Sequence, residues 1–237
     1  TDAGPVMVAE HPQEASVPPV APVADGTVRI EIPIPTDRHK IAIVGYTPSN
    51  RETPYDDPEW EIWALNNLHQ YLPRRDDGTL KAHLWFDLHL PDLIRSDEKH
   101  VAWLKQGVLP TVMLWPDPEF PASVRYPQRE IVAEFGSYMT NSISWMIALA
   151  IVRLTDIASL PDGRTHRIAK AGATIGLWGI DLAQQDEYQW ERPSVEHMIG
   201  RASGCGIDVY VPASSDLMKT AALYGVESDQ VLRAKMT

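Results

Sequence analysis

The sequence has little of what several protein classes require. Its 237 residues include a single cysteine, Cys205, so no intramolecular disulfide can form and a reducing compartment is expected. No apolar run approaches the roughly 18 residues of a membrane-spanning helix, and no cationic segment followed by an apolar stretch marks a secretory leader. These absences predict a cytoplasmic protein without a membrane partner.

Positive charge is also scarce. The chain carries 21 Lys and Arg against 32 Asp and Glu, for a net charge of −11 and a pI near 5.1. Extended binding to duplex nucleic acid is not expected, because that activity normally needs a basic face. Histidine and cysteine show no metal-ligand spacing, since on one strand His83 and His89 would lie roughly 20 Å apart. The sequence therefore predicts no metal site.

Residues 1–36 differ from the rest of the chain. Seven prolines interrupt this segment, and its apolar residues show no overall periodicity. Such a segment buries too little apolar surface to offset the entropy lost on ordering, which predicts a flexible arm before a single Rossmann-like domain over residues 37–237. The arm is either a tail without chemistry or a segment that clasps a neighbouring subunit in a homo-oligomer. Its alternating stretch 28–32 could dock on a sheet edge.

Beyond residue 40, short apolar runs alternate with helical patterns. This alternation predicts an α/β fold with a doubly wound, mostly parallel Rossmann-like sheet and helices on both faces. The strongest helix, 143–154, is apolar almost all round and is expected to be buried, with Asn141 or Ser142 as its N-cap. The expected strands are 41–44, 61–66, 83–87, 111–115, 173–179 and 207–211, and the other expected helices are 97–106, 127–135 and 193–203.

The stretch KIAIVGYTPSN at residues 40–50 is the most informative in the chain. Its apolar run ends at Gly45 and breaks into a polar turn, as in a buried parallel strand that delivers its carboxyl end to a ligand. Gly45 would let the backbone approach a ligand closely, while Thr47, Ser49 and Asn50 would supply hydrogen-bonding groups. The loop lacks the full G-x-G-x-x-G spacing, so a standard dinucleotide site is not predicted.

Polar residues also stand where other expected elements end or begin. They are Asn66 and Asn67 after the second strand, Asp87 and His89 after the third, Thr140, Asn141 and Ser142 before the buried helix, and Asp181 after the fifth strand. Because parallel strands end along one edge of a sheet, these groups are expected to share a pocket, with the helix start suited to a phosphate or carboxylate. The simpler alternative is that the asparagines and the 140–142 turn only cap helices and that Asp181 braces its loop.

Glu196 and His197 form a second concentration of candidate groups. On a helix that begins near Pro193, Glu196 falls in the first turn, where its carboxylate could act as a base or nucleophile. The alternative is an ordinary capping role at the helix start. His197 points about 100° away from Glu196 around the helix, so the two need not act together. Asp181 is a third candidate for a catalytic role.

The order of these motifs resembles that of the bacterial lipooligosaccharide sialyltransferases, which are Rossmann-type glycosyltransferases. Four motifs over roughly residues 40–215 carry the resemblance: Ile-Val-Gly-Tyr-Thr-Pro-Ser49, Ile-Trp-Ala-Leu-Asn66-Asn67, Tyr-Met-Thr140-Asn141-Ser142 and Ile-Gly-Leu-Trp-Gly179-Ile-Asp181. The family reads Gly-Asn-Gly-Pro-Ser, Cys-Asn-Gln, Thr-Ser-Gly and Ser-Gly-Ile-Asp at these places. The chain is also similar to proteins of unsettled activity encoded by phages of actinobacteria.

The resemblance implies that the substrate is a nucleotide or nucleotide-sugar and that no cofactor is permanently bound. By this likeness the nucleotide contacts would come from Thr47, Ser49, Asn66, Thr140, Asn141 and Ser142. The chain departs from the family pattern at Tyr46, where the family has Asn, and at Asn141-Ser142, where it has Ser-Gly. The family's catalytic histidine has no clear match, and His197 is only a loose candidate.

Three functions are consistent with these features. The first is a nucleotide-sugar-dependent, glycosyltransferase-like enzyme, encoded by a phage if the second similarity holds, in which Glu196 or His197 deprotonates the acceptor hydroxyl. The second is an N-glycosidase-like enzyme, because residues 196–212 weakly resemble the nucleophile-bearing region of nucleoside deoxyribosyltransferases, with Glu196 as nucleophile. The third is a non-catalytic accessory protein that binds a nucleotide or a protein partner.

Overall fold

The computed structural model describes residues 37–182 and 186–219, together with the backbone but not the side chains of 186–189. The predicted arm at 1–36, with its strand-like stretch 28–32, lies outside the described residues, so the division into arm and domain stays a prediction. Within the described part, no helix is long and apolar enough to cross a membrane.

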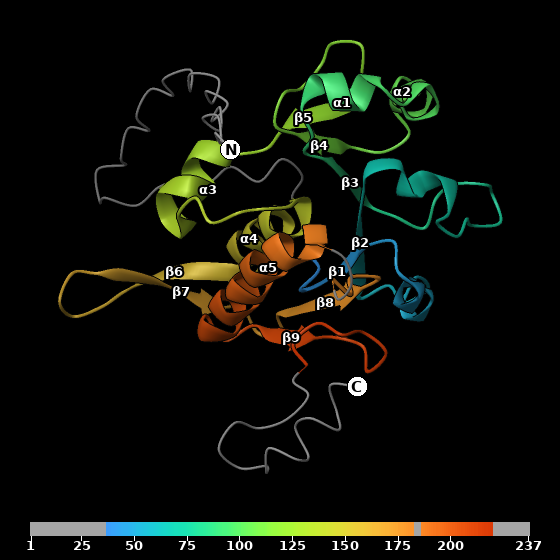
Figure 1. Ribbon diagram of the computed structural model, residues 1–237. Helices are drawn as coiled ribbons and strands as arrows, with labels where there is room; N and C mark the ends of the chain where they lie inside the picture. Colours follow the sequence, from blue (N-terminus) through green and yellow to red (C-terminus); the bar gives the residue numbers. More distant parts are fainter. Residues whose placement is uncertain (1–36, 183–185, 220–237) are drawn as a thin grey trace, which may run out of the picture.

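A seven-stranded sheet forms the centre of the molecule (Figure 1). Every neighbouring pair of its strands is parallel, which confirms the predicted α/β class. The strand order is β5-β4-β3-β2-β1-β8-β9. The strands are β1 (Lys40–Val44), β2 (Trp60–Leu65), β3 (Leu84–Asp87), β4 (Thr111–Met113), β5 (Ser123–Arg125), β8 (Thr174–Trp178) and β9 (Asp208–Tyr210). All six strands expected from apolar runs are present, and β5 is an addition in a segment expected to be loop.

Helices cover both faces of the sheet, also as predicted. Side chains along β1 alternate between two hydrophobic cores, because Ile41 and Ile43 face one layer while Ala42 and Val44 face the other. The first layer contains α3 (Gln128–Phe135), α4 (Ser142–Leu154) and α5 (Asp186–Gly204). The second contains α1 (Pro91–Arg95), α2 (Glu98–Leu104) and the short 3₁₀ helix η2 (Asn66–Gln70). A further 3₁₀ helix, η1 (Pro48–Glu52), follows β1. The continuous apolar character of α4 is explained by its burial at nearly every position.

An antiparallel hairpin, β6 (Thr155–Ser159) and β7 (Thr165–Ala169), extends from the body beside α4 (Figure 1). It was not expected from the sequence, because its strands are polar and half-exposed and show no buried run. Its turn contains Gly163 at φ +82°, a conformation that glycine adopts without steric cost.

Helix α5 begins earlier than predicted. The sequence placed its start at Pro193, but the helix runs from Asp186 with the proline inside it. A proline within a helix removes one backbone donor and displaces the carbonyls of the preceding turn. Here the carbonyls of Trp190 and Glu191 accept hydrogen bonds from the side chains of Thr140 and Asn141, at 3.0 and 3.2 Å. These contacts join the turn before the proline to the start of α4.

Candidate functional site

The strand order of the sheet changes direction between β1 and β8, which makes this position the topological switch point of the sheet. From β1 the order runs through β2, β3, β4 and β5 to one side, and β8 and β9 lie on the other. Open α/β sheets bind their ligands in a crevice outside the carboxyl ends of the two strands at such a point. The candidate site is therefore set by topology before any side chain is considered.

The two loops at this point are joined tightly. The Gly45 N–H donates to Trp178 O at 2.8 Å, and the Thr47 N–H donates to Gly179 O at 3.0 Å. In return, the Gly179 N–H donates to the hydroxyl of Ser49 at 2.8 Å. A Cβ on Gly45 would lie 2.3 Å from the carbonyl oxygen of Gly179, and a Cβ on Gly179 would lie 2.5 Å from that of Gly45. Only glycine fits at either position.

A cavity of about 550 Å³, the switch-point cavity, opens beside these two loops. Its lining comes from the loops after β1, β2, β3 and β8, from the start of α4 and from Glu191 of α5. The structure brings the following sequence-predicted residues together there: Gly45, Thr47, Asn66, Thr140, Asn141, Ser142 and Asp181. Its size falls in the range of about 300–1,000 Å³ that is usual for small-molecule sites.

Three residues that line this cavity each have one buried polar atom with no hydrogen-bond partner among the described residues. The atoms are Thr47 Oγ1, Asn66 Oδ1 and Asp181 Oδ1, which come from three different loops. Leaving a buried polar atom unpaired costs about 1–3 kcal/mol, so proteins rarely keep such groups without a reason. Three such residues around one cavity make it the candidate binding site.

Backbone strain is concentrated at the same place. Asn66 has φ +51° and Leu182 has φ +49°, and both line the cavity. The left-handed region costs an ordinary L-residue about 1–2 kcal/mol, and asparagine tolerates it better than leucine. Strained residues cluster at ligand sites, where the surrounding structure holds them in place.

The amino end of α4 points its first turn at the cavity. The N–H groups of a first helical turn have no partner within the helix and lie at the positive end of its dipole. Asn141 is the N-cap, and its Oδ1 accepts the N–H of Ser144 at 2.9 Å. Thr140 Oγ1 lies 2.7 Å from Ser194 Oγ and also donates to a carbonyl of α5. The side chains of Thr140 and Asn141 thus join the start of α4 to α5. Among the described residues, no hydrogen bond engages the Ser142 hydroxyl, and the N–H groups of Ser142 and Ile143 lie ahead of the capped Ser144.

Asp87, at the end of β3, holds two histidines. Its side chain is 1% exposed; Oδ1 lies 3.0 Å from His89 Nδ1 and Oδ2 lies 2.6 Å from His100 Nε2. Burial alone would raise the pKa of Asp87, but the hydrogen bonds from His100 and His89 hold that pKa below its usual value. The hydrogen bond to Asp87 raises the pKa of His89. His89 lines the cavity, although the sequence marked it only as part of a polar strand end.

Six predicted site residues do not line the cavity. Two of them are Asp87, which is buried behind His89, and Asn50, which donates to Gly45 O at 3.2 Å and faces a neighbouring cavity. Ser49 is buried beneath it and binds the Gly179 N–H, so its hydroxyl serves the loop contact. Asn67 accepts from the Tyr46 hydroxyl and faces a neighbouring cavity of about 980 Å³. Glu196 pairs with Arg192 in α5 at 2.7 Å. His197 is exposed, with its ring against that of Tyr138.

The placement of Glu196 follows from the corrected start of α5. The sequence put Glu196 in the first helical turn, at the rim of the sheet, whereas a start at Asp186 puts it in the middle of the helix. Besides its ion pair, Glu196 Oε1 accepts the Met218 N–H at 3.2 Å. Its carboxylate is thus engaged away from the switch-point cavity, and the predicted catalytic roles of Glu196 and His197 stay predictions.

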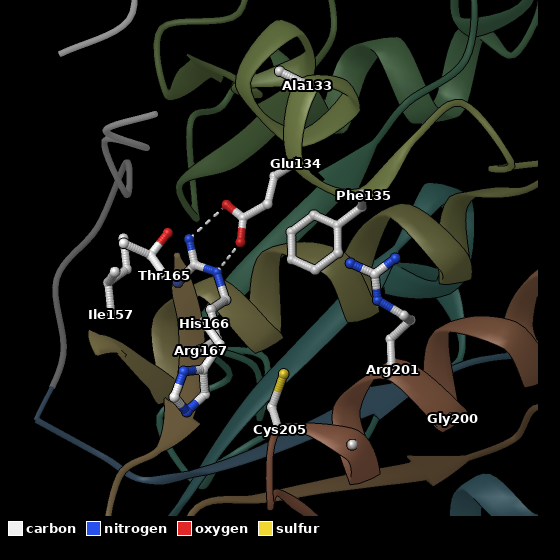
Figure 2. Close-up of a pocket in the computed structure, with 11 residues that line it drawn as sticks. Ala133, Glu134, Phe135, Ile157, Thr165, His166, Arg167, Gly200, Arg201 and Cys205 are labelled. Carbon is white, nitrogen blue, oxygen red and sulfur yellow. Dashed lines mark hydrogen bonds and ion pairs between the residues drawn. The ribbon is translucent and has the colours of Figure 1, made fainter. Parts of the chain in front are cut away.

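A second cavity, of about 570 Å³, lies where α3, the β6–β7 hairpin and the end of α5 meet (Figure 2). Its charged groups already have partners within the protein. Arg167 donates to Glu134 and, at 3.1 Å, to Thr155 Oγ1, while Arg201 lies over the ring of Phe135. The end of α5 leads into the start of β9, so this cavity lies at the amino edge of the sheet. No described residue that lines it has a buried side-chain polar atom without a partner, in contrast to the switch-point cavity.

Among residues 37–182 and 186–219, no group of three or more His, Cys, Asp or Glu side chains is arranged to hold a metal ion. The polar groups that line the switch-point cavity instead suit an organic ligand with its own donors and an anionic group.

Comparison with known proteins gives a fold likeness only. No family model and no curated protein matches the chain. Similar solved structures include the Campylobacter jejuni sialyltransferase CstII with the substrate analogue CMP-3FNeuAc (14% identity, TM-score 0.44, 73% of this chain and 80% of that chain). They also include an apo α-2,3-sialyltransferase from C. jejuni (16% identity, TM-score 0.43, 76% of this chain and 77% of that chain). At these scores the likeness supports no conclusion about function.

Proposed function

We propose that the switch-point cavity binds a nucleotide or nucleotide-sugar as substrate and that the protein is a glycosyltransferase-like enzyme. One observation carries the proposal: Thr47, Asn66 and Asp181 line one cavity beside the start of α4, and each has a buried side-chain oxygen without a partner among the described residues. The motif resemblance supports it independently, because these residues belong to the stretches that resemble the sialyltransferases.

The chemistry of the three atoms indicates what kind of ligand fits. The oxygens of Asn66 and Asp181 accept hydrogen bonds, so the ligand must bring donors such as the hydroxyls of a ribose or sugar, or the amino group of a base. Thr47 Oγ1 can donate or accept. The amino end of α4 favours an anion, and a phosphate is the group most often bound there. A nucleotide meets both requirements in one molecule.

The reaction that fits such a substrate is transfer of the sugar from the nucleotide to an acceptor hydroxyl. Asp181 would hold a hydroxyl of the donor, and the first turn of α4 would stabilise negative charge on the departing nucleotide phosphate. No observation in the cavity favours the N-glycosidase alternative, because the carboxylate it requires, that of Glu196, is paired with Arg192 elsewhere on α5.

Thermal unfolding with a panel of nucleotides and nucleotide-sugars tests the proposal. A ligand at 100 times its Kd adds about 2.7 kcal/mol of stability. For a domain of this size each kcal/mol shifts Tm by about 2–4 °C, so a true ligand should raise Tm by roughly 5–11 °C. A panel in which no member raises Tm would contradict the proposal.

Two substitutions make the test specific to the unpartnered atoms. Thr47→Val removes an unpartnered hydroxyl, so the free protein should be as stable as wild type or more stable, while the ligand-induced shift falls. Asn66→Gly removes the side-chain amide, and glycine adopts the φ of +51° at this position without strain. The ligand-induced shift should fall in this variant too. Thr53→Val is the matched control, because the Thr53 hydroxyl is also buried but lines the neighbouring cavity. Equal ligand shifts in Thr47→Val and Thr53→Val would show that the ligand lies elsewhere.

A further inference from the structure

We propose that His89 is the general base of the reaction, held in position by Asp87; this inference rests on the proposed function of the cavity. His89 would take the proton of the acceptor hydroxyl as that oxygen forms a bond to the anomeric carbon of the sugar. The bond between the anomeric carbon and the phosphate oxygen breaks, and its electron pair leaves with the nucleotide. The proton ends on Nε2 of His89.

The geometry fixes which nitrogen of His89 is available. Nδ1 lies 3.0 Å from Asp87 Oδ1, and the backbone N–H of His89 donates to the same oxygen at 3.3 Å. An ionised carboxylate only accepts hydrogen bonds, so Nδ1 carries the proton and neutral His89 has its lone pair on Nε2. No hydrogen bond to Nε2 exists within the described part of the chain, and the side chain, 37% exposed, lines the cavity.

The carboxylate oxygen of Asp87 that does not contact His89 is also hydrogen-bonded. This oxygen accepts from His100 Nε2 at 2.6 Å, and His100 Nδ1 lies 3.1 Å from His69 Nε2. His69 is stacked on Trp103 with ring centroids 4.4 Å apart and planes 2° apart. This buried row leaves Asp87 no freedom to turn away from His89. A histidine base oriented by a hydrogen-bonded carboxylate is an arrangement that enzymes use in acid–base catalysis.

Other groups near the cavity are less suited to the role. Asp181 and Glu191 also line it, but a carboxylate is a weak base near neutral pH, whereas imidazole titrates close to it. The other titratable groups that line the cavity are Tyr46 after β1, Asp181 after β8 and Glu191 on α5, and His100 on α2 shares the Asp87 carboxylate with His89. Asp87 is the one hydrogen-bonded to His89, and it raises the pKa of His89.

The test separates catalysis from binding. The donor is chosen as the nucleotide-sugar that gives the largest thermal shift, its Kd is measured by calorimetry, and turnover is followed as release of free nucleotide with and without a panel of sugar acceptors. His89→Gln should lower kcat by about 10²–10⁴-fold, with Kd for the donor changed less than threefold. His83→Gln is the matched control: His83 is half-buried and accepts the Ile62 N–H at 2.9 Å, outside the cavity. It should leave kcat unchanged.

The pH profile tests the role of Asp87. A base must be unprotonated, so wild-type kcat/KM should fall as pH decreases through a pKa above 6.5, the ordinary value for histidine. Asp87→Asn should move this acidic limb to lower pH and reduce kcat, because the amide neither attracts the imidazolium nor fixes the same tautomer. A purely structural Asp87 would leave the limb where it was.

Each remaining outcome is decisive. Unchanged kcat in His89→Gln, an acidic limb that persists in that variant, or equal losses in binding and turnover would overturn the role of His89. Donor binding without turnover by the wild type would overturn it as well, while leaving the proposed binding site intact. If no nucleotide or nucleotide-sugar binds, the proposed function fails first and this inference fails with it.

Discussion

The contact between Gly45 and Gly179 predicts which glycines of this chain cannot become alanine. A Cβ on Gly45 would lie 2.3 Å from the Gly179 oxygen, and the reverse substitution gives 2.5 Å. Both oxygens belong to the backbone, so no side-chain rotation can relieve the overlap. Gly45→Ala must therefore push the two loops at the switch point apart.

The expected cost follows from the hydrogen bonds that such a movement breaks. Three of them join the loops: Gly45 N–H to Trp178 O, Thr47 N–H to Gly179 O and Gly179 N–H to Ser49 Oγ. At about 0.5–1.5 kcal/mol net for each, Gly45→Ala should lower the free energy of unfolding by about 2–4 kcal/mol. Gly179→Ala adds the strain of φ +68°, which costs a further 1–2 kcal/mol or so.

Urea unfolding followed by far-UV circular dichroism measures these differences by linear extrapolation. Alanine variants at two other glycines separate the cost of backbone strain from the cost of steric overlap. Gly163 has φ +82°, and a Cβ added there would have nothing within 4 Å, so Gly163→Ala should show the conformational cost alone, about 1–2 kcal/mol. Gly200 lies in α5 with open space around it, so Gly200→Ala should stabilise the protein by up to about 1 kcal/mol.

The outcome for Gly45→Ala is the critical one, because Gly45 has an ordinary φ and only the overlap penalises alanine there. A stability within about 0.5 kcal/mol of wild type, the usual range for a neutral surface change, would refute the close packing of the two loops. The argument for a cavity built on that packing would then fail too. A destabilised Gly45→Ala that also loses the nucleotide-induced thermal shift would support both.

Three further predictions concern stability. Glu61 and Arg153 form a buried ion pair 2.9 Å apart, with each side chain 3% exposed. Arg153→Met leaves the Glu61 charge buried and unpaired, so it should lower the free energy of unfolding in urea by about 3–5 kcal/mol. Adding Glu61→Gln removes that charge and should recover at least half of the loss. Burial lowers the pKa of His83 to about 4, so the unfolded chain binds an extra proton between about pH 6.5 and 4. Stability should fall as pH decreases through that window, and a slope unchanged in His83→Gln would contradict this. Asn141→Ala removes the N-cap of α4 and should lower the free energy of unfolding by about 1–2 kcal/mol. Asn141→Asp should keep the hydrogen bond to the Ser144 N–H but weaken nucleotide binding, because it adds a negative charge beside the phosphate. Unfolding and thermal-shift measurements on both variants check the two effects.

The sheet could be predicted because its signals are local. Each expected strand is a short apolar run, and such a run in a parallel sheet is buried on both faces. The elements that were missed lack this signal: β5 has three residues, none of them fully buried, and the β6–β7 hairpin is largely exposed. The early start of α5 was also missed, because a proline is common in the first turn of a helix and the sequence therefore indicated that turn at Pro193.

The candidate site divides in the same way. The sequence alone determined that polar groups such as Thr47, Asn66 and Asp181 follow strand ends, and parallel topology requires those ends to lie along one edge. Only the tertiary structure decided which groups remain free for a ligand. Ser49 and Thr140 are engaged within the protein, whereas His89 is turned into the cavity by a carboxylate buried two residues before it. Hydrophobic pattern is a property of neighbouring residues, but the satisfaction of a hydrogen bond depends on partners brought together from distant parts of the chain.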